Sequence, residues 1–260
     1  ATTVAPFEER ALEPLQLSNK NVLIPVLDGA TGEYDLQKAF EAVGFTVSQE
    51  IIHTRDHQAW QTSIEQLAGK ISEVGIFALP HGDYFGSAIK NCAGALSAVL
   101  EDERVAKALE ELKAGQGFIL GIGAGMAALV DAGYFGDIKD DFYFTTNKLD
   151  KYTHFMQDVS IIKNSYLSKA SHSIYTAPVS GRQMTIHCHD LARLSQKVDI
   201  IAMNTISHLP SDCGVDSIAS KCGHVFGTRT LIDRMRPGLY QNIAISALPK
   251  HFEVLAESFC

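Results

Sequence analysis

The first half of the chain alternates short apolar segments with segments in which apolar residues recur at helical spacing. The short segments predict strands, and runs such as Asn21–Leu27 and Val74–Leu79 are apolar enough for burial on both faces of a parallel sheet. The expected strands are Asn21–Leu27, Phe45–Ile52, Val74–Leu79 and Gly117–Gly121. The expected helices are Tyr34–Val43, Gln58–Ile71, Ser87–Leu112 (broken near Glu101–Asp102) and Ala124–Ala132. This alternation predicts an α/β fold with a doubly wound, mostly parallel sheet.

The second half has a different pattern, with strands and few helices between them. The expected strands there are Asp141–Asn147, Asp158–Lys163, Ser173–Val179, Met184–His189 and Val198–Asn204. A helix is expected at Leu248–Phe259. Residues 1–20 lack a basic region followed by an apolar stretch, so they do not resemble a signal peptide and are expected to form a linker or N-terminal arm. We therefore expect one domain over residues 21–260, with a β-rich second half.

The net charge of the chain limits which kinds of partner it can bind, and its cysteine content indicates the redox state of its compartment. With 22 Lys and Arg against 30 Asp and Glu, the net charge is −8, which argues against nucleic acid or an anionic membrane as the main partner. The longest uncharged segment, Ala114–Val130, contains five glycines and predicts a strand and a turn rather than a membrane helix. The five cysteines are widely spread and form no Cys-x-x-Cys motif, so a reducing cytoplasm is expected rather than a disulfide framework.

The most informative local feature is Leu120–Met126, where a buried strand runs through a glycine-rich turn directly into a helix. In a nucleophile elbow, small flanking residues let a strained central residue project above the sheet, and the helix N-terminus behind it stabilises an anion. Here the central residue is Gly123, which has no side chain. The pattern also fits a tight strand–helix turn whose glycines serve packing alone, and it matches only part of a dinucleotide-binding fingerprint.

Six stretches carry a family resemblance through their order and spacing. They are VLIPVLDGATGEYDLQKAFEAVG (Val22–Gly44), FALPHGDY (Phe77–Tyr84), FILGIGAGMAALVDAGYFG (Phe118–Gly136), FTTNKLDKYTH (Phe144–His154), TAPVSGR (Thr176–Arg182) and SIASKCGHVFGTRTLIDRMRPGLYQN (Ser217–Asn242). Together they resemble the class I glutamine amidotransferase domain of phosphoribosylformylglycinamidine synthase. The resemblance covers nearly the whole chain after residue 20, and it implies the flavodoxin-like fold of that family.

When this sequence is matched to the family residue by residue, the positions of two of the family's catalytic side chains carry residues that cannot replace them. The family's Cys nucleophile falls on Gly123 and its His base on Leu231, whereas the acid that orients the base falls on Asp233. Glutamine hydrolysis needs a thiolate to attack the amide carbon and an imidazole to move protons. The resemblance therefore implies a degenerate, glutaminase-inactive domain with no intact catalytic residue.

Residues that could still bind a ligand follow the third and fourth expected strands. His81 and Gly82 stand where the family has a Gly-Gly-Phe-Ser loop that supplies oxyanion-hole amides. Gly121 and Ala124 belong to the turn whose helix N-terminus would attract an anion. A binding role is therefore expected for His81, Gly82, Gly121 and Ala124, without a cofactor.

The remaining cysteines and histidines suggest weaker candidates. Cys92 is expected to be a small buried residue on a helix. In the segment His187–Asp190, strand alternation would point both histidines to one face, where a metal would still need a third ligand. No metal is expected there, nor at the irregularly spaced Cys213, Cys222 and His224. Residues expected to face solvent or a partner chain are His208, His224, His251, Arg229, Arg234 and Arg236.

Three functional hypotheses follow from these observations. The first is a non-catalytic scaffold or partner surface, bound to the synthase domain or subunit of a purine-biosynthesis assembly in which ATP-dependent amidation takes place elsewhere. The second is an active enzyme of another class, and the third is a small-molecule sensor. Both alternatives would use the crevice near His81, Gly123 and Asp233.

Overall fold

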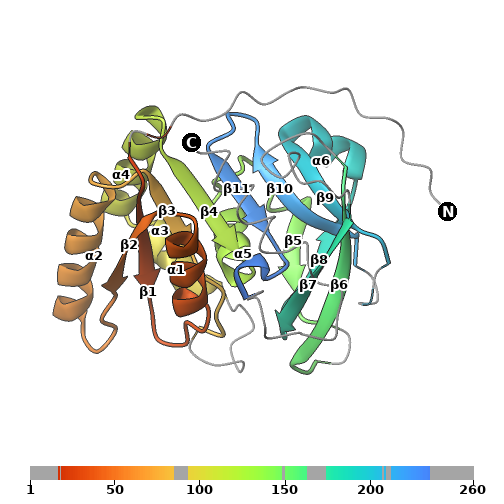
Figure 1. The fold of residues 1–260 in the computed structure, drawn as a ribbon, viewed down its shortest axis with the longest axis horizontal. Coiled ribbons are helices and arrows are strands. Elements are labelled where there is room, and N and C mark those ends of the chain that lie inside the picture. The colour runs from red at the N-terminus through yellow and green to blue at the C-terminus, as the bar shows by residue number, and fades with distance from the viewer. Residues whose placement is uncertain are drawn as a thin grey trace.

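A computed structural model of the chain describes residues 17, 19–84, 93–147, 150–162, 174–206, 208 and 212–234. The strands of its main sheet are β1 (Asn21–Val26), β2 (Thr46–Ile51), β3 (Ile76–Leu79), β4 (Phe118–Ile122), β6 (Thr153–Ile161), β7 (Ile174–Gly181), β9 (Val198–Asn204), β10 (Val215–Ser220) and β11 (Val225–Thr228). In space they follow the order β2-β1-β3-β4-β11-β10-β9-β6-β7 (Figure 1). A separate antiparallel pair consists of β5 (Phe142–Thr145) and β8 (Thr185–Cys188).

The main sheet changes direction at β11. From β2 through β1, β3 and β4 to β11, every neighbouring pair is parallel. From β11 through β10, β9 and β6 to β7, every pair is antiparallel. The expected α/β fold with a mostly parallel first part and a β-rich second part is therefore confirmed. The late strand β11 inserts beside β4, with Gly227 opposite Gly121 and Thr228 opposite Ile122.

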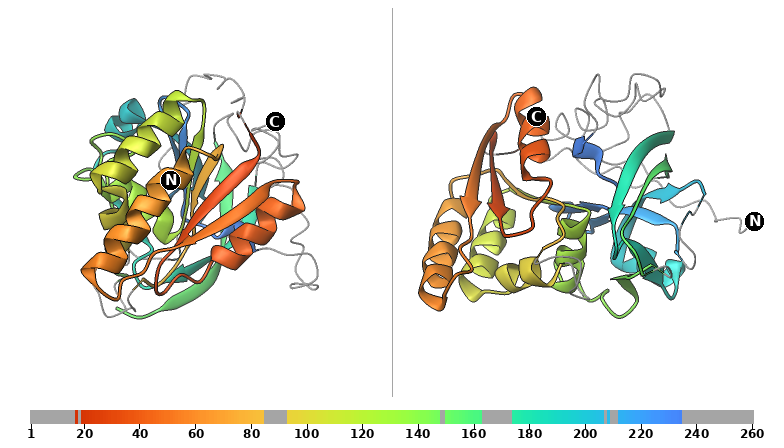
Figure 2. Two further views of the ribbon diagram at one scale, coloured as in Figure 1. Left: turned by 90° about the vertical axis from the view of Figure 1, so that its left-hand side faces the viewer. Right: turned by 90° about the horizontal axis from the view of Figure 1, so that it is seen from below.

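Helices cover both faces of the parallel part of the sheet. They are α1 (Glu33–Ala42), α2 (His57–Ile71), α3 (Gly94–Leu100), α4 (Glu103–Ala114) and α5 (Ala124–Asp131). Helix α6 (Leu191–Lys197) packs instead against β9 in the antiparallel part. The right-hand view of Figure 2 shows α1 on one face, with α2 to α5 on the other. Alternate residues of β4 point to opposite faces of the sheet. Leu120 belongs to the core cluster on the face covered by α1, and Ile119 belongs to the cluster on the face covered by the other helices.

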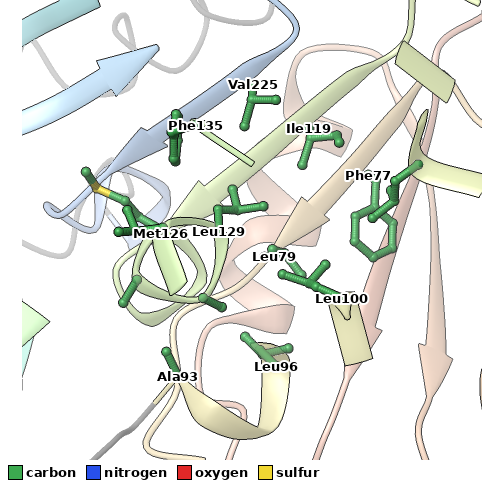
Figure 3. Packing of buried hydrophobic residues seen from close by; sticks show 14 of the residues in the cluster. Phe77, Leu79, Ala93, Leu96, Leu100, Ile119, Met126, Leu129, Phe135 and Val225 are labelled. Atoms are coloured by element: carbon green, nitrogen blue, oxygen red, sulfur yellow. The ribbon is translucent and has the colours of Figure 1, made fainter. Parts of the chain in front are cut away.

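The larger core cluster lies between the parallel strands and helices α3 and α5 (Figure 3). Phe77, Ile119 and Val225 from the strands and Leu96 and Leu129 from those helices belong to this cluster, and all five are fully buried. This packing anchors the N-terminal end of α5 against the carboxyl ends of β3 and β4, where the candidate site lies.

Aspartates set the beginnings of three helices. The side chain of Asp102 accepts a hydrogen bond from the backbone N–H of Arg104, so the expected break near Glu101–Asp102 separates α3 from α4. Asp56 begins α2 in the same way, through the N–H of Ala59. Asp190 begins α6 by accepting hydrogen bonds from the backbone N–H groups of Ala192 and Arg193. No helix was predicted at this position in the β-rich second half.

The second half departs from the predicted boundaries in two further ways. Strand β6 begins at Thr153 rather than at 158, because its first residues pair with the end of β7. Strands β10 and β11 were not predicted. The polar residues of β10, and Gly227 and Thr228 in β11, obscure the apolar pattern, although both strands are fully buried. The predicted helix Leu248–Phe259 lies outside the described residues, as does most of the proposed arm at 1–20. Among the described helices, none is long and apolar enough to cross a membrane.

Candidate functional site

The candidate site is built around the turn between β4 and α5. Gly123 has φ +56° and ψ −112°, a conformation that side-chain-bearing residues rarely adopt. The turn is fixed on both sides, because the Gly123 N–H donates to the carbonyl of Thr228 in β11 at 2.8 Å and the Gly123 carbonyl accepts from Ala127 at 3.2 Å. The flanking glycines allow close packing, since a Cβ at Gly121 would lie 2.7 Å from the backbone of Gly125. The geometry is that of a nucleophile elbow.

The imidazole of His81 fills the space above this elbow. A Cβ placed on Gly123 would overlap Nδ1 of His81 and would lie 2.9 Å from Cδ2 of Leu231. The backbone N–H of Ala124, the first residue of α5, donates a hydrogen bond to Nδ1 of His81 at 3.2 Å. The structure thus brings together three of the residues singled out in the sequence, His81, Gly123 and Leu231, and a fourth, Ala124, contacts His81.

The hydrogen bonding assigns the protonation state of His81. Because Nδ1 accepts from Ala124, the proton of the neutral ring resides on Nε2. Burial lowers the pKa of His81 to about 3, and the nearby positive charge of Arg234 contributes to the same shift. The Nε2 atom is itself buried and has no hydrogen-bond partner among the described residues. The ring is therefore neutral at physiological pH and presents a single unused N–H donor.

The backbone around His81 is tied to the loop after β1. The carbonyl of His81 accepts from the N–H groups of Thr31 at 3.2 Å and Gly32 at 3.0 Å. Gly82 forms a bridge with Ala30, and a Cβ at Gly82 would lie 2.7 Å from the carbonyl oxygen of Gly29. A side chain at Gly82 would therefore push the two loops apart. These contacts fix the backbone of His81 and Gly82 against the loop after β1.

The wall opposite His81 comes from the segment after β11. Leu231 is fully buried, and its N–H donates to the carbonyl of Pro178 in β7 at 2.8 Å. Asp233 follows in the 3₁₀ helix η1 (Ile232–Arg234) and is 3% exposed. Arg234 donates through Nη2 to Oγ1 of Thr31 at 2.9 Å, which joins this segment to the loop after β1.

A further carboxyl group, that of Asp83, lies two residues after His81. Burial raises the pKa of Asp83, and the positive charge of Arg234 partly opposes this shift. The N–H of Asp83 donates to the carbonyl of Gly29 at 3.0 Å. The positive charge of Arg234 thus acts on both Asp83 and His81. Arg234 was expected to face solvent or a partner chain, and it is partly buried.

Arg229 corrects one expectation directly. It was expected to face solvent or a partner chain, but its side chain is fully buried. Its Nη1 donates to the Asp212 carboxylate at 2.7 Å and its Nη2 to Oδ1 of Asn204 at 2.6 Å, while Nε lies 3.7 Å from the Asp216 carboxylate. The partners lie in β9, before β10 and in β10, and they surround Arg229 only because β9, β10 and β11 pair in space.

The remaining candidates lie elsewhere in the fold. His187 stacks on Tyr143 with ring centroids 5.6 Å apart, and His189 is tilted against the same ring at 5.8 Å. Nδ1 of His224 donates to the carbonyl of Gly117 at 2.9 Å, so this partly buried residue does not simply face solvent. His208 is exposed and lies against Phe155. No three His, Cys, Asp or Glu residues in the described ranges are grouped so as to hold a metal. Cys92, His251 and Arg236 lie outside the described residues.

Several solved structures resemble this chain over most of its length. A search of solved structures finds PurLQS from Thermotoga maritima, with a TM-score of 0.66 and 16% identity over 93% of this chain and 97% of the other. The glutaminase domain of Trypanosoma brucei CTPS with bound acivicin has a TM-score of 0.53 and 12% identity, over 92% and 93% of the two chains. A glutamine amidotransferase from Thermotoga maritima has a TM-score of 0.52 and 13% identity, over 92% and 95%. These likenesses establish the shared fold.

A search of curated proteins finds no match. The family model of the CobB/CobQ-like glutamine amidotransferase domain matches residues 19–203, which include β1 to β4, the His81 loop and the elbow at Gly123. The match spans well over half of the chain and agrees with the fold of the solved glutamine amidotransferase structures. The chain therefore belongs to the family of CobB/CobQ-like glutamine amidotransferase domains.

Proposed function

We propose that this chain is an amidotransferase domain without glutaminase activity, which acts as a scaffold or partner surface in a phosphoribosylformylglycinamidine synthase-type assembly of purine biosynthesis. The observation that carries the proposal is the position of the His81 ring over Gly123, in the space that a nucleophilic side chain would need. An elbow positions its central side chain for attack, and a glycine with a ring packed against it has nothing to position.

The oxyanion-binding part of an elbow is also occupied. In an elbow, the N–H of the residue after the nucleophile donates to the developing oxyanion. Here that residue is Ala124, and its N–H donates to Nδ1 of His81. A substrate carbonyl would first have to displace the imidazole from this donor.

His81 does not replace the missing base. A general base needs a free lone pair and a proton affinity close to the working pH. The Nδ1 lone pair already accepts from Ala124, Nε2 carries the proton, and burial lowers the pKa of His81 to about 3. At the other position proposed for the base, Leu231 supplies only an alkyl group, so the carboxyl group of Asp233 has no imidazole there to orient.

The preserved fold supports a role as a partner surface. The family match and the likeness to PurLQS show that the chain retains the overall architecture of the family. An architecture that is kept without a nucleophilic side chain at Gly123 supports a role in binding rather than in catalysis. The sequence resemblance to phosphoribosylformylglycinamidine synthase makes a synthase domain or subunit the expected partner, in a cytoplasmic assembly. In that assembly ammonia would come from solution or from another subunit.

The test of inactivity is release of glutamate and ammonia from glutamine by the purified chain, alone and with the synthase subunit of the same source. We expect no release above the buffer blank in either case. The variant Asp233→Asn serves as the control, because a residual amidase would lose activity with it, whereas contaminating glutaminase would not. Turnover that Asp233→Asn abolishes would overturn the proposal. Co-elution with the synthase subunit in gel filtration tests the scaffold role, and separate elution of the two chains would contradict it.

A second candidate function, small-molecule sensing, is favoured by the unused Nε2–H of His81. This donor is buried at the carboxyl ends of β3 and β4, the edge at which doubly wound sheets bind ligands. A ligand with a hydrogen-bond acceptor would satisfy it. A thermal-shift screen with amino acids and nucleotides tests this function, and the expected stabilisation should disappear in His81→Leu.

A further inference from the structure

Strand β2 forms one end of the main sheet, and within the described part of the chain no strand pairs with its outer edge (Figure 1). Most of its residues are exposed, namely Thr46, Ser48, Gln49 and Ile51. The other end of the sheet is protected, because β7 contains Pro178, whose carbonyl accepts from the N–H of Leu231. A regular strand with an open edge and without proline is a surface on which another strand can pair.

The direction of the backbone decides which groups of β2 are available. The N–H groups of Thr46 and Ile52 donate to carbonyls of the β1 segment at 2.9 and 2.8 Å, so the even-numbered residues of β2 face β1. The N–H and C=O of one strand residue point to the same side, and this side alternates along the strand. Val47, Gln49 and Ile51 therefore present their backbone donors and acceptors at the open edge.

The side chains of these three residues lie on the face of the sheet that α1 covers. Val47 packs against the core cluster that includes residues of α1, and Nε2 of Gln49 donates to Oε1 of Gln37 in α1 at 2.7 Å. Ile51 is 59% exposed, although it belongs to a strand. On the opposite face, Glu50 forms an ion pair with a lysine of α2, so its charge is compensated within the chain.

We propose that two copies of this chain associate edge to edge through β2, as antiparallel strands related by a twofold axis at Gln49. In this register Val47 lies opposite Ile51 of the second copy, and Gln49 lies opposite Gln49. Each of the pairs of outward-facing residues can then exchange two hydrogen bonds. Any other register leaves at least one of the three residues without an outward-facing partner in β2.

The same register makes the edge complementary to itself. It places the apolar side chains of Val47 and Ile51 side by side, where Ile51 is otherwise exposed. Glu50 lies opposite Ser48, so no like charges face each other across the two strands. A twofold interface uses one patch on both copies, which is why a self-complementary edge selects a second copy as its occupant.

Sedimentation velocity of the full chain, from micromolar to millimolar concentration, tests the association. We expect the mass to rise toward twice that of one chain. Ile51→Lys should weaken the association roughly tenfold or more, because it sets a charge against the apolar side chain of Val47. Ile174→Lys is the matched control and should associate as the unaltered chain does, since Ile174 is 53% exposed in β7 at the far end of the sheet. The mass of one chain at every concentration would overturn the proposal, and so would undiminished association of Ile51→Lys.

A cysteine on the twofold axis tests the register. In Gln49→Cys the two introduced residues lie opposite each other with their Cα atoms about 5.5 Å apart, so oxidation with copper phenanthroline should link the copies through position 49. Thr46→Cys is the control on the same exposed strand, because its two copies lie on the order of 20 Å apart and should not link. Peptide mapping separates these links from any link through the native cysteines. Linkage at position 46, or an associated Gln49→Cys chain without linkage at position 49, would contradict the proposed pairing.

Discussion

Nδ1 of His81 occupies the place where a side chain at Gly123 would begin. The two residues depend on each other, because the ring fits only over a glycine, and the helix N–H that the glycine exposes is satisfied by the ring. A substitution at either position should therefore be felt at the other. The position of the His81 ring over Gly123 can therefore be tested by measuring the stability of variants at the two positions.

Gly123→Ala should destabilise the fold by about 3 kcal/mol, because the positive φ and the overlap with His81 add their costs. Gly44→Ala is the matched control, since Gly44 has φ +87° and nothing within 4 Å of an added Cβ. That variant should lose only the conformational part, about 1 kcal/mol. Urea unfolding of both variants gives the two values, and equal losses would mean that His81 does not obstruct Gly123.

The same obstruction should disappear when the ring is removed. In a His81→Gly background, Gly123→Ala should cost about as little as Gly44→Ala, so a double-mutant cycle should show a coupling of roughly 1 to 3 kcal/mol. If the losses of unfolding free energy for the two substitutions are additive, the destabilisation by Gly123→Ala comes from its backbone conformation alone and not from contact with His81.

Rebuilding the site requires three changes. The combination Gly123→Cys, His81→Gly and Leu231→His should give a thiol that reacts with a disulfide reagent below pH 7, because an adjacent imidazole stabilises the thiolate. The same chain with Leu231 retained is the control and should react only near the ordinary thiol pKa of about 8.5. The contact of Leu231 with the elbow indicates that positions 123 and 231 face each other. Identical pH profiles for the two chains would contradict this arrangement.

Local pattern was sufficient to predict the parallel half of the fold. Strands β1, β3 and β4 are short apolar runs, and the glycines around 123 mark a turn because few other residues fit there. The sequence also indicated that His81 and Gly123 follow neighbouring strands. It could not show that the imidazole enters the elbow, because this depends on the pairing of Ala30 with Gly82 across two loops.

Long-range pairing explains what the sequence did not predict. Strand β11 lies beside β4 although about a hundred residues separate them, and its position decides where Leu231 and Arg229 point. Arg229 resembles a solvent-exposed arginine until Asn204, Asp212 and Asp216 are brought around it. A basic residue is rarely buried without such partners, and the partners are recognisable only in three dimensions.

Arg229→Met should destabilise the chain by about 3 to 5 kcal/mol, because it leaves the buried carboxylates of Asp212 and Asp216 without their cation. Arg55→Met is the matched control, since the Arg55–Asp56 pair is largely exposed. That variant should change stability by less than about 1 kcal/mol. Denaturant unfolding compares the two, and a small loss for Arg229→Met would mean that the network does not hold the segment after β11.

The free energy of unfolding should fall in acid because His81 is buried as a neutral imidazole. Burial lowers the pKa of His81 to about 3 from an ordinary value near 6.5, so between these pH values the unfolded chain binds a proton that the folded chain does not. The stability contributed by the neutral ring is complete above pH 6.5 and is lost as pH falls toward 3, by about 1.4 kcal/mol per pH unit. In His81→Asn, whose side-chain oxygen can still accept from Ala124, this part of the pH dependence should vanish. His208→Asn, at an exposed histidine packed against Phe155, should retain it. Unfolding free energies of the three chains at pH 7, 5.5 and 4.5 test the prediction, and parallel curves for the unaltered chain and His81→Asn would refute a buried neutral imidazole over Gly123.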